Sequence, residues 1–215
     1  MRHILLLFLC LFLQACTQVQ QGLVDSVKQA FIGLDDVTVP VERIRSLPYA
    51  SIYLRVNHGQ RIFLVLGYAE NGQHKWVTQD RAMLVTQNGR LVKTLGLTNN
   101  LLETTNLSQD PLAQPLLIQE GDSWSYVLIW TDKGRLQSAL VTSRFQRAQD
   151  EILHIAGKAI ACRVWREKAS VAATGVRWQN TFWIDNASGE VRQSTQHSGA
   201  EALSVDITLL KPVKS

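Results

Sequence analysis

Short apolar segments separated by polar turns constrain the fold of this chain more than any other feature. From residue 35 onward the apolar positions follow period two or form short continuous runs. Ile52, Leu54 and Val56 occupy every second position, which puts three apolar side chains on one face of an extended strand. Asn-Gly pairs begin at Asn71 and Asn88, and their easy positive φ suits tight turns between antiparallel strands. The pattern predicts antiparallel β structure.

About ten strands are expected on this basis, and Gly157 is a candidate bulge or bend within a long one. The expected strands are residues 51–56, 61–68, 74–78, 82–86, 91–95, 123–131, 135–147, 152–166, 174–185, 190–197 and 203–210.

The middle of the chain, residues 96–121, is less regular because Asn99, Asn100, Pro111 and Pro115 interrupt any long element. We predict an irregular insertion here, with short helical turns around 101–105 and 112–117. Such a segment either forms a functional flap or plugs one end of the fold.

The fold class that follows is mainly β, an antiparallel soluble β-barrel-like domain with a short N-terminal helix. A closed barrel leaves no exposed sheet edges, which the alternative, a β-sandwich, would have to protect. The barrel should be filled and should not span a membrane, because Lys93 interrupts a strand and no aromatic girdles recur at strand ends.

The first residues indicate where the chain resides. Arg2 and His3 precede an apolar run at 4–13, which is too short to span about 30 Å of hydrocarbon, and Leu13-Gln14-Ala15-Cys16 follows. This is the pattern of a lipoprotein signal, with residues 1–15 removed and Cys16 acylated as a lipid anchor. An ordinary secretory peptide is the alternative. Since Thr17, and not Asp, follows Cys16, the expected location is the periplasmic face of the outer membrane.

The mature chain, residues 16–215, is expected to form a single periplasmic β domain. Residues 18–33 place apolar side chains three or four apart, and Gly33 suits a helix C-cap, so a short amphipathic helix is predicted. With the signal removed, the net charge is about +3. The basic side chains are interspersed with acidic ones, so no nucleic-acid partner is expected.

Cysteine usage agrees with an oxidising compartment. Cys10 leaves with the signal and Cys16 is acylated, so Cys162 is the remaining thiol and has no internal disulfide partner. It lies in an apolar β-like run, which favours a buried packing role over a nucleophile.

No motif assigns catalytic chemistry, a metal or a cofactor. The histidines lack metal-ligand spacing, and neither a strained nucleophile motif nor a glycine-rich phosphate loop is present. The nearest group of acids is Asp35, Asp36 and Glu42, which we expect to cap surface elements or to pair with Arg43 and Arg45.

Tryptophan is the residue type that points to a ligand. Indole faces stack on the C–H faces of sugars, although large aromatic side chains also fill barrel cores. The candidate saccharide-contacting residues are Trp124, Trp130, Trp178 and Trp183.

Two segments, DVTVPVERIRSLPYASI at 36–52 and DRAMLVTQNGRLVKT at 80–94, resemble the YjbF/GfcB family of enterobacterial lipoproteins. The resemblance extends over essentially the whole chain, with Gln14 a departure where a small residue is usual. It implies a β-barrel-like periplasmic domain encoded with group 4 capsule or related exopolysaccharide secretion genes. It transfers one site, the lipidation at Cys16, and no catalytic residue.

Two functions are open at this point. In the first, the protein is a non-enzymatic assembly or binding component that contacts other proteins of a polysaccharide secretion system, or the polysaccharide itself. In the second, it is a polysaccharide-modifying enzyme whose carboxylates come from separate strands.

Overall fold

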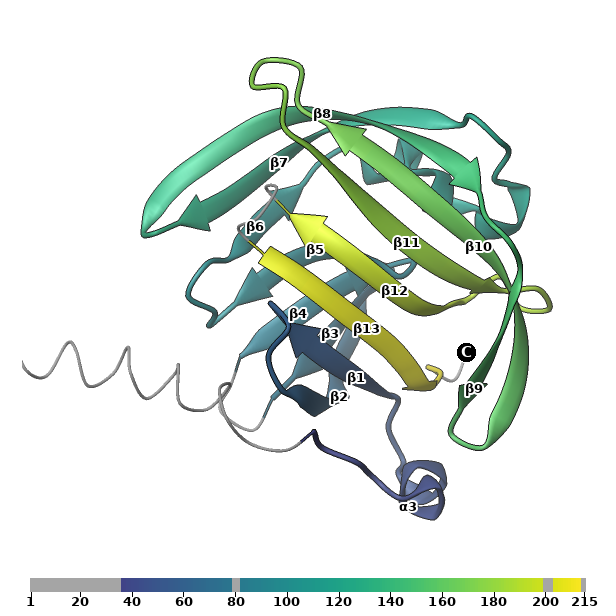
Figure 1. Cartoon of the computed structure of the whole chain (residues 1–215). Helices are drawn as coiled ribbons and strands as arrows, with labels where there is room; N and C mark the ends of the chain where they lie inside the picture. Colours follow the sequence, from purple (N-terminus) through teal and green to yellow (C-terminus); the bar gives the residue numbers. More distant parts are fainter. Residues whose placement is uncertain (1–35, 79–81, 199–202, 214–215) are drawn as a thin grey trace, which may run out of the picture. The chain divides into compact units, whose positions relative to one another are not determined.

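The structure is a computed structural model that describes residues 36–78, 82–198 and 203–213 (Figure 1). The signal segment, Cys16 and the helix expected at 18–33 lie outside the described residues. The described helices are α3 (Val41–Ser46) and the single-turn 3-10 helices η2 (Leu107–Gln109), η3 (Pro111–Ala113) and η4 (Pro115–Leu117). The described strands are β1 (Ser51–Val56), β2 (Arg61–Glu70), β3 (Gln73–Val77), β4 (Met83–Gln87), β5 (Arg90–Leu95), β6 (Leu101–Thr104), β7 (Ser123–Asp132), β8 (Arg135–Arg147), β9 (Glu151–Ile155), β10 (Lys158–Ser170), β11 (Arg177–Asp185), β12 (Val191–Ser198) and β13 (Leu203–Lys211).

One antiparallel sheet curls into a nearly closed barrel, which confirms the predicted fold class. Its hydrogen-bonded order is β5-β4-β3-β2-β1-β13-β12-β11-β10-β8-β7-β6, and β9 pairs with β10. Most neighbours in space are therefore neighbours in sequence, as expected of strands joined by tight turns. The exceptions are β8 with β10, between which β9 intervenes in the sequence, and β1 with β13, where Ser51 opposes Lys211.

The two ends of this strand order, β5 and β6, meet through side chains. Leu101 N donates to Thr94 Oγ1 at 2.9 Å, and Thr94 Oγ1 donates to Asn100 Oδ1 at 3.3 Å. Thr94 is fully buried at this seam. Polar side chains thus complete the hydrogen bonding where no backbone ladder joins the two strands.

The region around β9 and β10 differs from the prediction of one long strand at 152–166. The chain turns at Ala156 and Gly157, both with positive φ, and forms a hairpin. The first half of β10 pairs with β9 and its second half pairs with β8, so β10 has two different partners on the same edge. Gly157 is part of a reversal, and not a bulge inside a strand.

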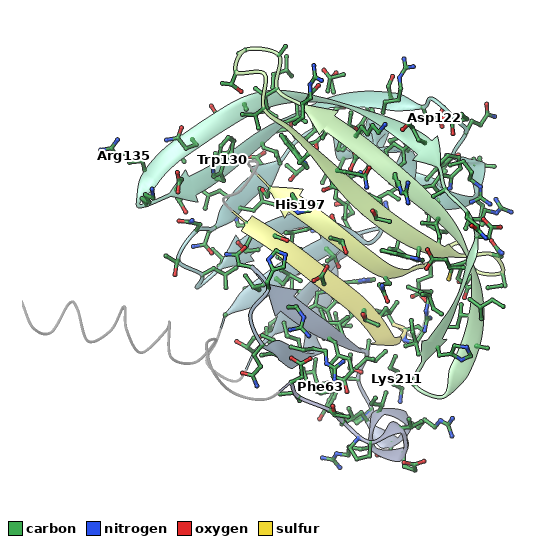
Figure 2. The ribbon with its side chains drawn as sticks, in the orientation of Figure 1. Phe63, Asp122, Trp130, Arg135, His197 and Lys211 are labelled. Carbon is green, nitrogen blue, oxygen red and sulfur yellow. The ribbon has the colours of Figure 1, made fainter. Side chains whose placement is uncertain are left out.

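Alternating side chains fill the barrel interior. Inward-facing residues of every strand except β9 contribute to one apolar cluster, in which Phe145 and Phe182 are fully buried. A smaller cluster around Ile44, Ile155 and Leu210 packs α3 and the β9–β10 hairpin against the outer face. Figure 2 shows Lys211 and Phe63 on this side of the barrel, and Lys211 Nζ donates to Arg45 O at 2.8 Å.

The segment between β6 and β7 crosses the end of the barrel where several hairpin turns gather. The helical turn predicted at 101–105 is wrong, because Leu101–Thr104 forms β6. The turn predicted at 112–117 corresponds to η3 and η4. Leu112 is fully buried and Ile118 nearly so, which anchors the crossing segment in the core. Within the part of the chain that the structure describes, no helix is long and apolar enough to cross a bilayer.

Candidate functional site

A buried arginine joins two carboxylates inside the barrel. Arg90 Nε and Nη2 donate to the two carboxylate oxygens of Asp110, the second at 3.0 Å. Arg90 Nη1 and Nη2 donate to Glu167 Oε2 and Oε1 at 2.9 and 3.1 Å. Arg90, Asp110 and Glu167 are 3%, 5% and 0% exposed, so charged groups that normally lie in water are held in the interior. We call these three side chains the Arg90 network.

Three uncharged side chains also donate hydrogen bonds to the Glu167 carboxylate. Its Oε1 accepts from Trp124 Nε1 at 3.0 Å and from Ser143 Oγ at 2.7 Å. Its Oε2 accepts from Asn180 Nδ2 at 2.7 Å. A buried carboxylate is stable only when it is paired and hydrogen-bonded in this way.

Local structure explains how three distant residues meet. Arg90 is the first residue of β5, directly after the Asn88-Gly89 turn, and its side chain points inward. Glu167 shares the inward face of β10 with Trp165, two positions earlier. Asp110 precedes η3 on the crossing segment and accepts from Leu112 N at 3.0 Å, so it caps that turn while it binds Arg90.

Electrostatics fix the ionisation of this network. Burial acts most strongly on Glu167 and would raise its pKa, but the charge and hydrogen bonds of Arg90, with the hydrogen bonds from Trp124 and Asn180, together lower the pKa. Burial likewise opposes the charge of Arg90, yet Asp110 and Glu167 raise its pKa. The guanidinium also lies 4.9 Å from the Trp124 ring centroid and 5.2 Å from that of Phe182. Glu167 is therefore held ionised and cannot serve as a proton donor near neutral pH.

Space beside the network is small. A cavity of about 10 Å³, lined by Arg90, Tyr126, Asn180 and Gln196 among others, has room for one water-sized molecule. A sugar ring does not fit there. Asp110 also lines a pocket of about 270 Å³ beside η2, η3 and η4, together with Asp122, but both Asp110 carboxylate oxygens already accept hydrogen bonds from Arg90.

A larger cleft lies where three hairpin turns and the crossing segment come together. We call it the turn-end cleft. It has a volume of about 370 Å³, within the range of small-molecule sites. Its described lining comes from the β2–β3, β4–β5 and β11–β12 turns, strands β3, β4, β12 and β13, η4 and the chain after β13. The lining residues are Gly72, His74, Trp76, Thr86, Asn88, Gly89, Pro115, Ser188, Gly189, Glu190, Val191, Leu209 and Val213.

Close packing holds the rim of this cleft. A Cβ added at Gly89 would lie 2.4 Å from Val191 Cβ, so the β4–β5 turn touches β12 directly. Gln196 binds both sides of this turn, donating to Gly89 O and accepting from Leu91 N, each at 2.9 Å. Since Arg90 lies between these two residues, the rim is joined to the buried network.

The sequence-predicted tryptophans do not gather in this cleft. Trp124 is 4% exposed and donates to Glu167, while Trp130 and Trp178 are half-buried and pack against the core. Trp183 lies on the other face of its strand and donates to Glu151 Oε2 at 2.9 Å. The tryptophan that lines the cleft is Trp76, which is nearly buried.

The structure also tests the predictions made for Cys162 and Asp36. Cys162 is fully buried, as predicted, and burial raises the pKa of its thiol to about 11.

The pairing expected for Asp36 is wrong: its partners are the Arg55 side chain at 2.6 Å and Arg61 N at 2.9 Å. The β1–β2 register sets Arg55 opposite Arg61, beside the segment that carries Asp36. Both contacts lower the pKa of Asp36, the Arg61 bond more.

The residues of the Arg90 network were not singled out from the sequence. One signal was present: Glu167 shares the period-two face of Trp165 and Ala169 and so occupies an inward position. An acid on an apolar face implies a buried partner, but nothing in the spacing identifies Arg90 or Asp110.

Comparison with known proteins gives a consistent family. The model of the family described as "Group 4 capsule polysaccharide lipoprotein gfcB, YjbF" matches residues 24–210. Among curated proteins of Escherichia coli K12, the chain is 48% identical to "Uncharacterized lipoprotein GfcB" over 99% of both chains. It is 40% identical to "Uncharacterized lipoprotein YjbF" over 100% of both.

A crystal structure described as the hypothetical lipoprotein YmcC from Escherichia coli K12 is similar with a TM-score of 0.79 and 49% identity. The match covers 82% of this chain and 91% of that one. Sequence and fold therefore agree that the chain belongs to the group 4 capsule polysaccharide lipoprotein family of GfcB and YjbF.

Proposed function

We propose that this protein is a non-enzymatic component of capsule or exopolysaccharide secretion, anchored by Cys16 at the periplasmic face of the outer membrane. Membership of a capsule-related lipoprotein family supports the process. The lipoprotein signal ending at Ala15 and Cys16 supports the anchor, and Thr17 supports the outer membrane as its destination.

The observation that carries the non-enzymatic part is the engagement of the buried acids. Asp110 and Glu167 are the carboxylates that the fold brings together in the interior, and one guanidinium holds both. A glycosidase needs one acid that is protonated and one that is free to act on water or sugar. Glu167 meets neither condition. Arg90 lowers the pKa of Glu167, so this acid is not protonated, and Arg90 donates to both of its carboxylate oxygens, so it is not free.

The turn-end cleft also lacks the pair of acids that glycoside hydrolysis requires. Glu190 is the carboxylate among its described lining residues. A binding role needs no second acid, so the cleft suits a protein that contacts or positions a polymer better than one that cuts it.

The test of this proposal compares the native chain with Cys16→Ser in a host whose own copy is deleted. Density fractionation of membranes should place the native protein in the outer membrane and the variant in the periplasm. Surface polymer, measured with a polymer-specific antibody, should fall with the variant. Undiminished export by the soluble form at the native protein level would refute a role for the anchor.

Two further measurements separate the functional classes. Affinity purification of the lipidated protein from membranes should recover other products of the same secretion system, and recovery of none would contradict an assembly role. Incubating the purified protein with the polymer should leave its chain length unchanged. Shortening that disappears in Glu190→Gln would instead establish the enzymatic alternative.

A further inference from the structure

The turn-end cleft combines apolar walls with polar side chains at its rim. Pro115, Val191, Leu209 and Val213 supply apolar surface, and the half-buried His74 packs edge-on against Trp76 with ring centroids 5.9 Å apart. A saccharide has the matching character, because its C–H faces are apolar and its hydroxyls require hydrogen bonds. A lipid chain would leave the polar rim unsatisfied.

Several hydrogen-bonding groups of the rim are not used within the described part of the protein. Glu190 Oε2 accepts from Arg192 Nη1 at 2.8 Å, but Glu190 Oε1 binds no described residue. The side chains of Asn88 and His74 likewise make no hydrogen bond to the described residues, and both line the cleft. Burial lowers the pKa of His74, so its imidazole is neutral at pH 7 and offers one donor and one acceptor.

The charges that line the cleft indicate which class of saccharide can bind there. Glu190 is the charged residue among the described lining, and neither Lys nor Arg contributes to it. Arg192 is nearly buried beneath the rim, where it binds Glu190 and donates to Leu209 O at 3.3 Å. A uronic acid or phosphorylated sugar would therefore meet Glu190 without a free cation to balance its charge. An uncharged sugar meets no such electrostatic repulsion, and its hydroxyl groups can donate hydrogen bonds to Glu190 Oε1.

The cleft is held in shape without a ligand. Trp76 Nε1 donates to Thr86 Oγ1 at 2.9 Å, which fixes the indole on the floor. A Cβ added at Gly189 would lie 3.0 Å from Leu116 Cγ, so the β11–β12 turn packs on the crossing segment. A rim fixed in this way loses little conformational freedom on binding.

We propose that the turn-end cleft binds an uncharged sugar unit of the exported polymer, with Glu190 Oε1, Asn88 and His74 as hydrogen-bonding groups and Pro115, Val191 and Val213 as the apolar wall. The choice of a polymer unit rests on the function proposed above. The preference for an uncharged sugar rests on the cleft alone.

The test uses the full-length lipidated protein in detergent micelles. An array of neutral and acidic bacterial glycans is screened first, and the strongest neutral glycan is then titrated beside a uronic-acid glycan of the same size. We expect the neutral glycan to bind at least tenfold more tightly. Absence of any neutral binder, or equal or tighter binding of the acidic glycan, would overturn the proposal.

Variants locate the binding. Ser188→Trp places a large side chain at the mouth of the cleft, and Ser138→Trp is the matched change on the exposed outer face of β8. Ser188→Trp should weaken binding of the neutral glycan at least tenfold, and Ser138→Trp should bind as the native protein does. Glu190→Gln keeps the shape, and should weaken neutral binding and reduce discrimination against the uronic acid. Unchanged binding by Ser188→Trp would exclude the cleft.

Export assays separate this proposal from the one on which it rests. If Cys16→Ser impairs export while Ser188→Trp neither binds differently nor exports differently, the sugar site fails and the anchored role stands. If the neutral glycan binds in the cleft but neither variant alters export, the site stands and the secretion role fails.

Discussion

Replacing Arg90 by Met should reverse the way in which acid affects the stability of this protein. Methionine retains an apolar chain between the Trp124 and Phe182 rings but removes the cation shared by Asp110 and Glu167. Removing one partner of a buried ion pair costs about 3–5 kcal/mol. A native domain has roughly 5–15 kcal/mol of unfolding free energy, so the variant should fold with a much reduced margin at pH 7.

The pH dependence has opposite signs in the two proteins. In the native protein the pKa of Glu167 lies below its ordinary value of 4.5, so the stability it contributes is present above that pH and is lost in more acidic solution. In Arg90→Met the largest lowering influence is gone and burial raises the pKa of Glu167 above 4.5. The variant should therefore gain stability between pH 7 and pH 5, by about 1.4 kcal/mol for each unit that the folded pKa is raised within that interval.

Urea unfolding followed by tryptophan fluorescence at pH 7 and pH 5 measures both effects. The triple variant Arg90→Met, Asp110→Asn, Glu167→Gln is the control, because it has no carboxylate in the network left to titrate. Its unfolding free energy should change with pH as that of the native protein does over this interval. An Arg90→Met variant that is as stable as the native protein, or that is destabilised on going from pH 7 to pH 5, would contradict this role of Arg90.

Two other substitution and labelling results follow from the packing. Gly89→Ala and Gly72→Ala both place a side chain at a positive φ, which costs about 1–2 kcal/mol, but only the Gly89 Cβ would collide with Val191. Chemical denaturation should therefore show Gly89→Ala to be less stable than Gly72→Ala by about 1–3 kcal/mol, and equal losses would contradict the packing. Because burial raises the pKa of Cys162 to about 11, iodoacetamide at pH 8 should label it at least about tenfold more slowly in the folded than in the urea-unfolded protein. Peptide mass spectrometry measures this ratio, and equally fast labelling would show that the thiol is accessible.

Local pattern was sufficient to predict much of the fold. The strands expected at 51–56 and 135–147 have the same bounds as β1 and β8, because alternation and flanking turns both define them. Where the pattern failed, a local irregularity explains it. A register shift between Leu101 and Glu103 interrupts the alternation of β6. The β9–β10 turn has Ala156 at φ 48°, and alanine gives no turn signal.

The site was less predictable than the fold because tertiary structure assembles it. Arg90, Asp110 and Glu167 come from a strand start, a crossing segment and the middle of another strand, and no short motif links them. The turn-end cleft likewise draws its lining from several turns and strands. Helix α3 was missed for a different reason, since six residues are too few to establish a helical period.

The pairing of β1 with β13 has a consequence for the order of folding. Among the described strands, β1 is the first along the chain and β13 is the last, and the two strands pair at six positions, among them Ser51 with Lys211. When the chain is delivered from its N-terminus, one edge of β1 stays unpaired until β13 arrives. Such non-local contacts slow folding to about milliseconds to seconds, and an unpaired edge exposes the chain to aggregation meanwhile. The barrel is therefore completed by its final strand, and truncation within β13 should leave an open sheet.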